Sequence, residues 1–320
     1  MEFGGDGREA GDGPTDIEAG PASRRSPRAP ALRRSAAPEP GDPGPPLRFL
    51  VVLAEEDPVA AGLSGGWGTP PAELRADGVP IRTLPGGIGL LRRPGRPVAG
   101  AGWTESLPEV LRAPPVPLLF PSVHRSAEGV RSFTAHPLGR WGLPDGGPAS
   151  PPELVPTAPR LMAAMLRALA ERAAPTGLPV TFEATHHGPW LRHPAFFLEI
   201  GGGAGPERPT PAELSILAGA IAAAAEDPHD RIAVGVGGGH YVPHFTELAL
   251  RRRWAFGHLL PRHVVEHLTR GMARAAWANT PGAEGILCAR AADRSDPAWA
   301  GIGPMLKDGE APRRPGTPDS

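Results

Sequence analysis

The histidines are the residues that most clearly indicate which chemistry this chain could carry out. All eleven histidines lie between residues 124 and 267 of a 320-residue sequence. Five of them directly follow predicted strands: His124 after VPLLF, His186 and His187 after VTFEA, and His240 and His244 after IAVGVGGG. Ligands of α/β proteins bind beyond the carboxyl ends of strands, and an imidazole exchanges protons near neutral pH. We therefore expect these imidazoles to share one cavity and to form an acid–base site.

A carboxylate accompanies the paired histidines in the segment EATHHGP, residues 183–189. Glu183 stands at the end of a strand and can orient a neighbouring imidazole and raise its basicity. We predict Glu183, His186 and His240 as catalytic residues, with one imidazole as general base and Glu183 as the group that orients it. The alternative is a glutamate that caps a loop beside two surface histidines.

Three consecutive glycines, Gly237, Gly238 and Gly239, precede His240. Glycines allow the backbone to approach a ligand closely and to direct amide N–H groups at a developing oxyanion. The pattern is neither a dinucleotide-binding fingerprint nor a phosphate loop, because no GK[ST] follows it. The alternative is an ordinary glycine-rich turn. Tyr241, the only tyrosine of the chain, is a substrate-binding candidate or a buried packing residue.

The same histidines are candidates for metal ligands. His186 and His240 could hold zinc together with Glu183 or Glu199, because zinc accepts imidazole and carboxylate ligands. His240 and His244 are four residues apart, but Pro243 interrupts a helix between them, and no HExxH motif occurs. The single cysteine excludes a disulfide scaffold and a zinc finger built from cysteines.

Charge is concentrated in one region although the whole chain has a net charge of -1. Residues 231–277 contain seven arginines against two glutamates. Arg251, Arg252 and Arg253 follow the glycine segment and are predicted to hold phosphates by charge rather than by reading sequence. A solvated helix face is the alternative. The near-neutral total argues against a polybasic nucleic-acid binder, and 5% aromatic residues argue against stacking platforms for single-stranded nucleic acid.

Strands and helices alternate along the part of the chain that holds these residues. This order predicts an α/β domain with a mostly parallel central sheet flanked by helices. Thr157 is expected to cap the first long helix, and Thr210 with Glu213 forms a predicted capping box. The predicted strands are 47–53, 116–120, 180–184, 195–200, 231–236, 254–260 and 285–290, and the predicted helices are 157–173, 211–227, 244–252 and 262–277.

Composition divides the chain into three parts. Residues 1–46 are rich in proline, glycine and arginine and are predicted to be a disordered head, since they offer little apolar area to bury. Residues 47–304 form the predicted single domain, and residues 305–320 a disordered tail. No apolar run is long enough for a transmembrane helix, and no apolar segment typical of a signal peptide follows the start.

These motifs resemble the archaeal and plant type of D-aminoacyl-tRNA deacylase. The similar stretches, in the order of the family, are SVHRSAEG, FTAHPLG, FEATHHGP, FFLEIG, GGGHYVPHFTELAL and GHLLP. The resemblance implies a fold similar to peptidyl-tRNA hydrolase and nucleoside phosphorylases. It also implies hydrolysis of the ester between a D-amino acid and the tRNA 3′ end, an association with zinc, and a cytoplasmic location.

The resemblance suggests roles for further residues. His124 and Arg125 would hold the terminal nucleotide, Arg251–Arg253 the acceptor phosphates, and His187, Glu199, Tyr241 and His244 would contact substrate. We expect a monomer with no membrane contact and no obligate protein partner. Two alternatives remain: a nucleosidase or phosphorylase on the same fold, and a catalytically impaired tRNA-binding paralogue. The second is raised because Arg140 stands where the family usually has asparagine and the 201–209 loop differs.

Overall fold

The computed structural model describes residues 47–67, 72–76, 79–97, 115–125, 129–143, 151–202 and 208–307. The predicted head, residues 1–46, and residues 308–320 of the predicted tail lie outside these ranges and stay predictions. Met305–Leu306 forms a short strand, β14, so regular structure extends past the predicted boundary at 304. Among the described residues, no helix is both long and apolar enough to cross a membrane.

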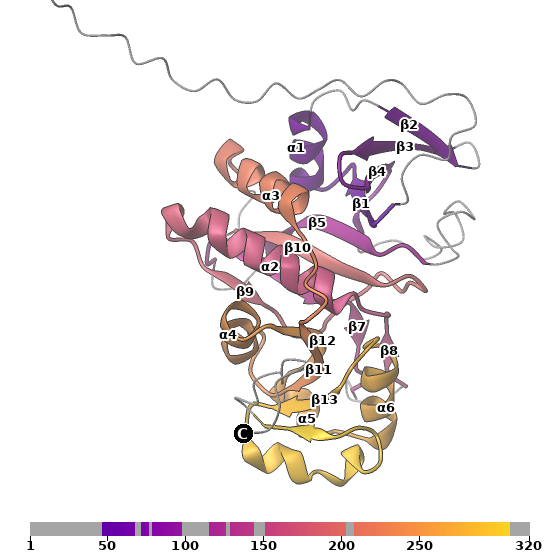
Figure 1. Cartoon of the computed structure of the whole chain (residues 1–320), viewed down its shortest axis with the longest axis vertical. Coiled ribbons are helices and arrows are strands. Elements are labelled where there is room, and N and C mark those ends of the chain that lie inside the picture. Colours follow the sequence, from indigo (N-terminus) through magenta and orange to yellow (C-terminus); the bar gives the residue numbers. More distant parts are fainter. Residues whose placement is uncertain are drawn as a thin grey trace, which may run out of the picture. The chain divides into compact units, whose positions relative to one another are not determined.

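The larger of two main sheets has eight strands in the order β2-β3-β4-β1-β5-β10-β6-β9 (Figure 1). Strand β1 pairs in parallel with β4 and β5, β5 with β10, and β6 with β9, whereas β10 and β6 are antiparallel. Strands β2, β3 and β4 form an antiparallel edge. The bounds are β1 Phe49–Ala54, β2 Ala72–Ala76, β3 Val79–Leu84, β4 Ile88–Arg93, β5 Leu118–Arg125, β6 Phe133–Pro137, β9 Val180–Phe182 and β10 Ala195–Gly202.

A second sheet of four parallel strands has the order β12-β11-β13-β14. Its other strands are β11 Arg231–Val236, β12 Trp254–Leu260 and β13 Gly285–Cys288, and a separate pair is formed by β7 Gly139–Arg140 and β8 Glu153–Leu154. The predicted α/β fold with mostly parallel strands is therefore confirmed. The structure adds one feature to this prediction: the last three predicted strands form a second sheet together with β14.

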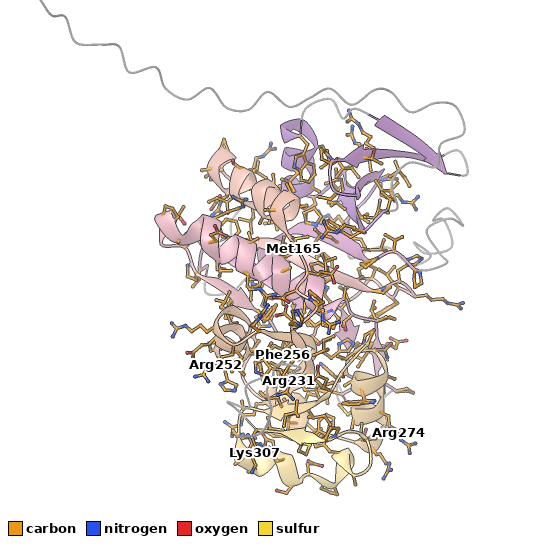
Figure 2. All side chains as sticks on the ribbon, viewed as in Figure 1. Met165, Arg231, Arg252, Phe256, Arg274 and Lys307 are labelled. Atoms are coloured by element: carbon orange, nitrogen blue, oxygen red, sulfur yellow. The ribbon has the colours of Figure 1, made fainter. Side chains whose placement is uncertain are left out.

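Helices pack against both sheets. Helix α2 contacts β9 and β12 as well as α3 and α4, and α1 packs on β1 and β5. The helices are α1 Pro58–Gly66, α2 Pro159–Ala173, α3 Pro211–Ala223, α4 Pro243–Arg251, α5 Arg262–Val265 and α6 Arg270–Ala278, with short 3-10 turns at Ala174–Thr176, Ala291–Ser295 and Pro297–Trp299. The apolar stripe predicted on α2, Leu161, Met165 and Leu169, is fully buried (Met165 is labelled in Figure 2).

The helix ends confirm one predicted cap and correct two other expectations. Thr210 and Glu213 form the predicted capping box of α3. Thr157 does not cap α2: its hydroxyl donates to the carbonyl of Asn279 instead, and Ala158 occupies the cap position. The single helix predicted at 262–277 is two helices, because Thr269 starts α6 by accepting a hydrogen bond from the Met272 amide.

The segment Glu183–Thr185 joins the two sheets. The Glu183 amide donates to the carbonyl of Ala135 in β6, which pairs with the edge strand β9 in the large sheet. The Thr185 amide donates to Leu259 in β12, and the Ala184 amide donates to His240 just beyond β11. The end of β9 is thus held between the two sheets, and this junction brings the glycine segment to the paired histidines.

Candidate active site

Glu183 occupies the centre of the junction and is fully buried. Its two carboxylate oxygens face three imidazoles that come from different parts of the chain. Oε1 lies 3.4 Å from Nδ1 of His124, and Oε2 lies 3.2 Å from Nε2 of His240 and 3.6 Å from Nε2 of His186. The structure therefore brings together one histidine from each of the three predicted groups: His124 near the end of β5, His186 after β9 and His240 after β11.

A second buried carboxylate, Glu199 of β10, lies beside Glu183 in the same cluster. His124 on the parallel neighbour β5 is hydrogen-bonded to it, with 3.2 Å between Nδ1 and Oε2. His136 on the antiparallel neighbour β6 approaches the same oxygen to 3.7 Å. Glu199 was predicted as a substrate-binding residue, whereas its observed contacts are with two imidazoles.

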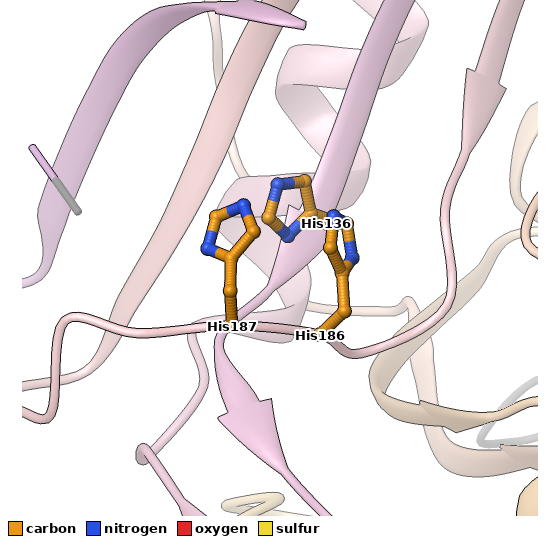
Figure 3. Close-up of side chains that lie close together, drawn as sticks. All are labelled: His136, His186 and His187. Carbon is orange, nitrogen blue, oxygen red and sulfur yellow. The ribbon is translucent and has the colours of Figure 1, made fainter. Parts of the chain in front are cut away.

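His136 is the member of the cluster that the sequence reasoning missed. It is fully buried, and its ring lies 4.0 Å from the ring of His186 and 4.9 Å from that of His187, measured between centroids (Figure 3). Its sequence signal is the stretch FTAHPLG, which resembles the family but contains no pattern that marks His136 as a site residue. Because β6 inserts between β10 and β9, a strand distant in sequence carries this imidazole into the site.

Burial and charge give these imidazoles opposite acid–base properties. Burial alone would lower the pKa of His124 and of His136, but the Glu199 carboxylate, with Glu183, raises both above the ordinary value. Burial would raise the pKa of Glu199, yet its contacts with His124 and His136 hold that pKa well below its usual range. Burial, with the charge of His136 and His187, lowers the pKa of His186 to about 2. Burial, with the charge of His136, also lowers the pKa of His187.

His186 is consequently neutral at physiological pH, and its hydrogen bond identifies the tautomer. Nδ1 lies 2.8 Å from the carbonyl of Ala184, so Nδ1 carries the hydrogen and donates it. Nε2 is then an acceptor that faces the acceptor oxygen Oε2 of Glu183. Neither oxygen of Glu183 nor Nε2 of His136 has a hydrogen-bond partner among the described residues. Facing acceptors require a shared donor or cation between them, which is the arrangement that positions a water or binds a metal ion.

The glycine segment adopts backbone conformations that favour glycine. Gly237 has φ +111° and Gly238 φ +92°. The Gly237 amide donates to the carbonyl of Leu260, 2.8 Å away, so the prediction that it helps to bind an oxyanion is wrong. In the described part of the chain the amides of Gly238 and Gly239 have no such acceptor. These two glycines line an open cleft of about 670 Å³, together with Arg262, His263, Glu266 and Arg290.

The other predicted residues divide between the cluster and more distant places. His187 is in the cluster, and Tyr241 joins it through a 3.3 Å hydrogen bond between Oη and Nε2 of His124. His244 lies on α4, where its described ring contact is with Phe245. Arg125 ends β5, but its side chain is outside the described part.

Arg251, Arg252 and Arg253 lie at the opposite end of α4 from the glycine segment, about 13 Å along a nine-residue helix. Arg251 pairs with Glu247 and Arg253 with Asp227, and Arg252 is exposed at the end of α4 (Figure 2). The structure therefore does not bring these arginines to the imidazole cluster. Phosphate binding by them stays a prediction for a more distant part of a ligand.

The donor set of the cluster fits a zinc ion. His124, Glu183 and His240 form one group, His136, His186 and His187 a second, and His136, Glu183 and Glu199 a third; within each group the ligand atoms lie within 4.8 Å of one another. Imidazole nitrogen and carboxylate oxygen are ligands that zinc accepts. The two oxygens of Glu183 are buried without a hydrogen bond from the described residues, and this observation favours a cation here.

Fold and cluster together define an α/β protein with a buried carboxylate–imidazole centre where two sheets meet. The model of the D-aminoacyl-tRNA deacylase family matches residues 114–298, which include every member of the cluster. The chain belongs to the D-aminoacyl-tRNA deacylase family, as the sequence motifs predicted.

Individual relatives agree with this assignment. A D-aminoacyl-tRNA deacylase of Methanoregula boonei is 43% identical over 144 residues, which are 44% of this chain and 32% of that protein. One of Thermoplasma acidophilum is 34% identical over 179 residues, 56% of this chain and 69% of that protein. The chain thus spans about a third of the first relative and about two thirds of the second.

A solved structure is similar over most of the chain. It is the crystal structure of a conserved protein of unknown function, AF0625, with a TM-score of 0.68 and 26% sequence identity. The match covers 81% of this chain and 95% of that one. The fold around the cluster is therefore shared with this protein.

Proposed function

We propose that this protein hydrolyses the ester bond of D-aminoacyl-tRNA and releases the D-amino acid and free tRNA. The observation that carries the proposal is the pair of facing acceptors, Oε2 of buried Glu183 and Nε2 of neutral His186. A water held between them has both of its hydrogens directed at acceptors and its lone pair free to attack. The names of the relatives and of the matching family supply the substrate class.

In the proposed mechanism the water attacks the ester carbonyl while the pair of acceptors that holds it, Glu183 and His186, takes its proton. Amides of Gly238 and Gly239 donate to the oxyanion that forms; one such donor contributes about 3 kcal/mol in studied enzymes. The bond to the ribose oxygen then breaks, and His240, with 48% of its side chain exposed at the rim of the cluster, donates a proton to that oxygen, while the proton taken from the water is released to solvent. The products are the amino acid with its carboxylate and the tRNA 3′ end with its hydroxyl.

We also propose zinc as the cofactor, held by His124, Glu183 and His240 or by His136, His186 and His187. An imidazole that holds the ion would not exchange a proton, so the first set would leave His186 for that role and the second would leave His240. When bound, the ion supplies positive charge that polarises the ester carbonyl. The acidic partners Glu183 and Glu199 offset part of that charge and hold the imidazoles in place. Support for zinc comes from the donor types and from the unpartnered carboxylate.

The test is deacylation of matched D- and L-tyrosyl-tRNA by the full chain and by Glu183→Gln, His186→Ala and His240→Ala. The wild type should release D-tyrosine faster than L-tyrosine, and each variant should lose at least a hundredfold in kcat. His229→Ala is the matched control, because His229 is exposed before β11, at the opposite end of that strand from the glycine segment. Wild-type rates in both His186→Ala and His240→Ala would refute the proposed base.

The same assay separates the alternatives that the sequence left open. Salt-dependent binding of tRNA without ester turnover would favour an impaired tRNA-binding paralogue. Phosphate-dependent release of a free base with no need for tRNA would favour a nucleosidase or phosphorylase. We also propose a cytoplasmic location, because charged tRNA, the proposed substrate, is found in the cytoplasm. The monomeric state remains a prediction, which analytical sedimentation can test.

A further inference from the structure

Trp190 is a large apolar side chain that the fold leaves open to solvent. Its relative exposure is 41%, and among the described residues only Val130 is a comparably exposed large hydrophobic. The indole lies against the backbone of Gly188, where an added Cβ would come within 3.3 Å of the ring. The ring is thus supported from the protein side by a residue without a side chain, and it has accessible surface left.

Arg140 is held beside this ring. Its guanidinium carbon lies 5.7 Å from the ring centroid, and one nitrogen is 2.7 Å from a carboxylate oxygen of Glu153. The ion pair restrains a side chain that would otherwise sample many rotamers. An aromatic ring and a guanidinium plane are the two kinds of surface on which proteins stack nucleobases.

Backbone contacts connect both residues to the imidazole cluster. The amide of Gly139, the neighbour of Arg140, donates to the carbonyl of His187 at 2.8 Å, and Leu138 forms a bridge with His186. Trp190 follows His187 by three residues, a reach of at most about 11 Å. In an aminoacylated 3′ end, one ribose carries both the ester and the terminal base. When the ester lies at the cluster, the base must therefore lie close beside it.

We propose that Trp190 and Arg140 form a stacking platform for the 3′-terminal adenine of the tRNA substrate. This inference rests on the proposed function. The platform holds the base while the ester lies at Glu183 and His186, so it contributes to substrate affinity and not to the chemical step. A single-base platform also differs from the extended aromatic surfaces that the low aromatic content argued against.

The test is binding, which needs no turnover. An uncharged RNA minihelix ending in CCA is compared with one whose last nucleotide lacks its base, using fluorescence anisotropy with wild type, Trp190→Ala and Trp190→Phe. Removal of the base should weaken wild-type binding about tenfold, as expected for one stacked base. Trp190→Ala should bind both RNAs equally weakly, and Trp190→Phe should restore most of the preference. Val130→Ala, at the other exposed hydrophobic, should keep the full preference.

Kinetics with a substrate that lacks the nucleoside complete the test. Trp190→Ala should raise KM for D-tyrosyl-tRNA about tenfold with kcat within twofold, and should hydrolyse D-tyrosine ethyl ester like the wild type. Equal loss of affinity on base removal in wild type and Trp190→Ala would overturn the platform. Equal affinity of the wild type for the RNAs with and without the terminal base would also overturn it. If wild type binds the base but releases no amino acid from charged tRNA, the proposed function fails and the platform stands.

Discussion

His258 is predicted to make the stability of this protein depend on pH in a way that one substitution removes. It is fully buried in β12, where Nε2 lies 3.0 Å from the carbonyl of Val155 and Nδ1 lies 3.1 Å from the hydroxyl of Thr185. Burial lowers its pKa from 6.5 to about 3, with a smaller opposing effect from the hydrogen bond to Val155. The folded protein therefore keeps this imidazole neutral, whereas the unfolded chain protonates it below about pH 6.5.

The sign and size of the effect follow from this difference in pKa. Because the unfolded state binds the additional proton, the contribution of His258 to stability is complete above pH 6.5 and is lost as the pH falls towards about 3. Between pH 7.5 and pH 5.5 the free energy of unfolding falls by about 1.4 kcal/mol through His258, because pH 5.5 lies one unit below the pKa of histidine in the unfolded chain. At pH 4.5 it reaches about 2.7 kcal/mol.

The assay is urea unfolding of wild type and His258→Gln at pH 7.5 and pH 5.5. Glutamine can donate to Val155 and accept from Thr185, and any constant cost of the substitution cancels when each protein is compared with itself. The variant should lose about 1.4 kcal/mol less than the wild type between the two pH values. His229→Gln, an exposed control, should lose as much as the wild type. Equal losses in His258→Gln and wild type would refute a neutral buried imidazole at this position.

Four further predictions concern the helix cap, the turn, the cleft and the metal. Thr210→Ala should lower the unfolding free energy by about 1 kcal/mol, because the capping box is lost, and should leave kcat unchanged in a deacylation assay. Gly238→Ala should lower Tm and kcat together, since φ is +92° and the new Cβ would lie 3.0 Å from Val242; a wild-type Tm would contradict this reading. Arg262→Gln should raise KM for charged tRNA and reduce the slope of log affinity against log salt by about one, if the cleft beside Gly239 holds a phosphate. Treatment with a chelator should remove one or more zinc ions measurable by mass spectrometry and lower Tm, and a metal-free protein as purified would contradict the zinc proposal.

Local patterns in the sequence predicted the elements around the site well. The strand at residues 231–236 was placed at its observed bounds, because a short apolar run that ends in glycines has few other structures available. The Thr210 capping box was equally local. His124, His186 and His240 were correctly expected to share one site, but the reason given for it was wrong. Strand β9 runs antiparallel to β5 and β11 belongs to the second sheet, so these imidazoles meet at the junction of two sheets and not at one edge of parallel strands.

What the sequence left out depends on contacts between distant segments. His136 joins the cluster only because β6 pairs antiparallel with β10. The local sequence FTAHP does not indicate with which strand β6 will pair. The amide of Gly237 was available in the sequence but bonds to Leu260 in the fold. The division into two sheets was also invisible, since it depends on where β12 meets the end of β9. The sequence patterns also predicted no element between residues 54 and 112, where the structure has α1, β2, β3 and β4.

The junction that Glu183–Thr185 forms between the two sheets determines how this protein loses activity. The large sheet and its edge carry Glu183, Glu199 and His136, whereas His240 follows a strand of the second sheet. The cluster therefore exists only while the two sheets stay packed together. Mild denaturant that separates the layers would abolish turnover while each sheet keeps its own backbone pairing. Inactivation should then precede the change in far-ultraviolet circular dichroism, and the amides of Ala184 and Thr185 should exchange with deuterium at the same denaturant concentration as activity disappears.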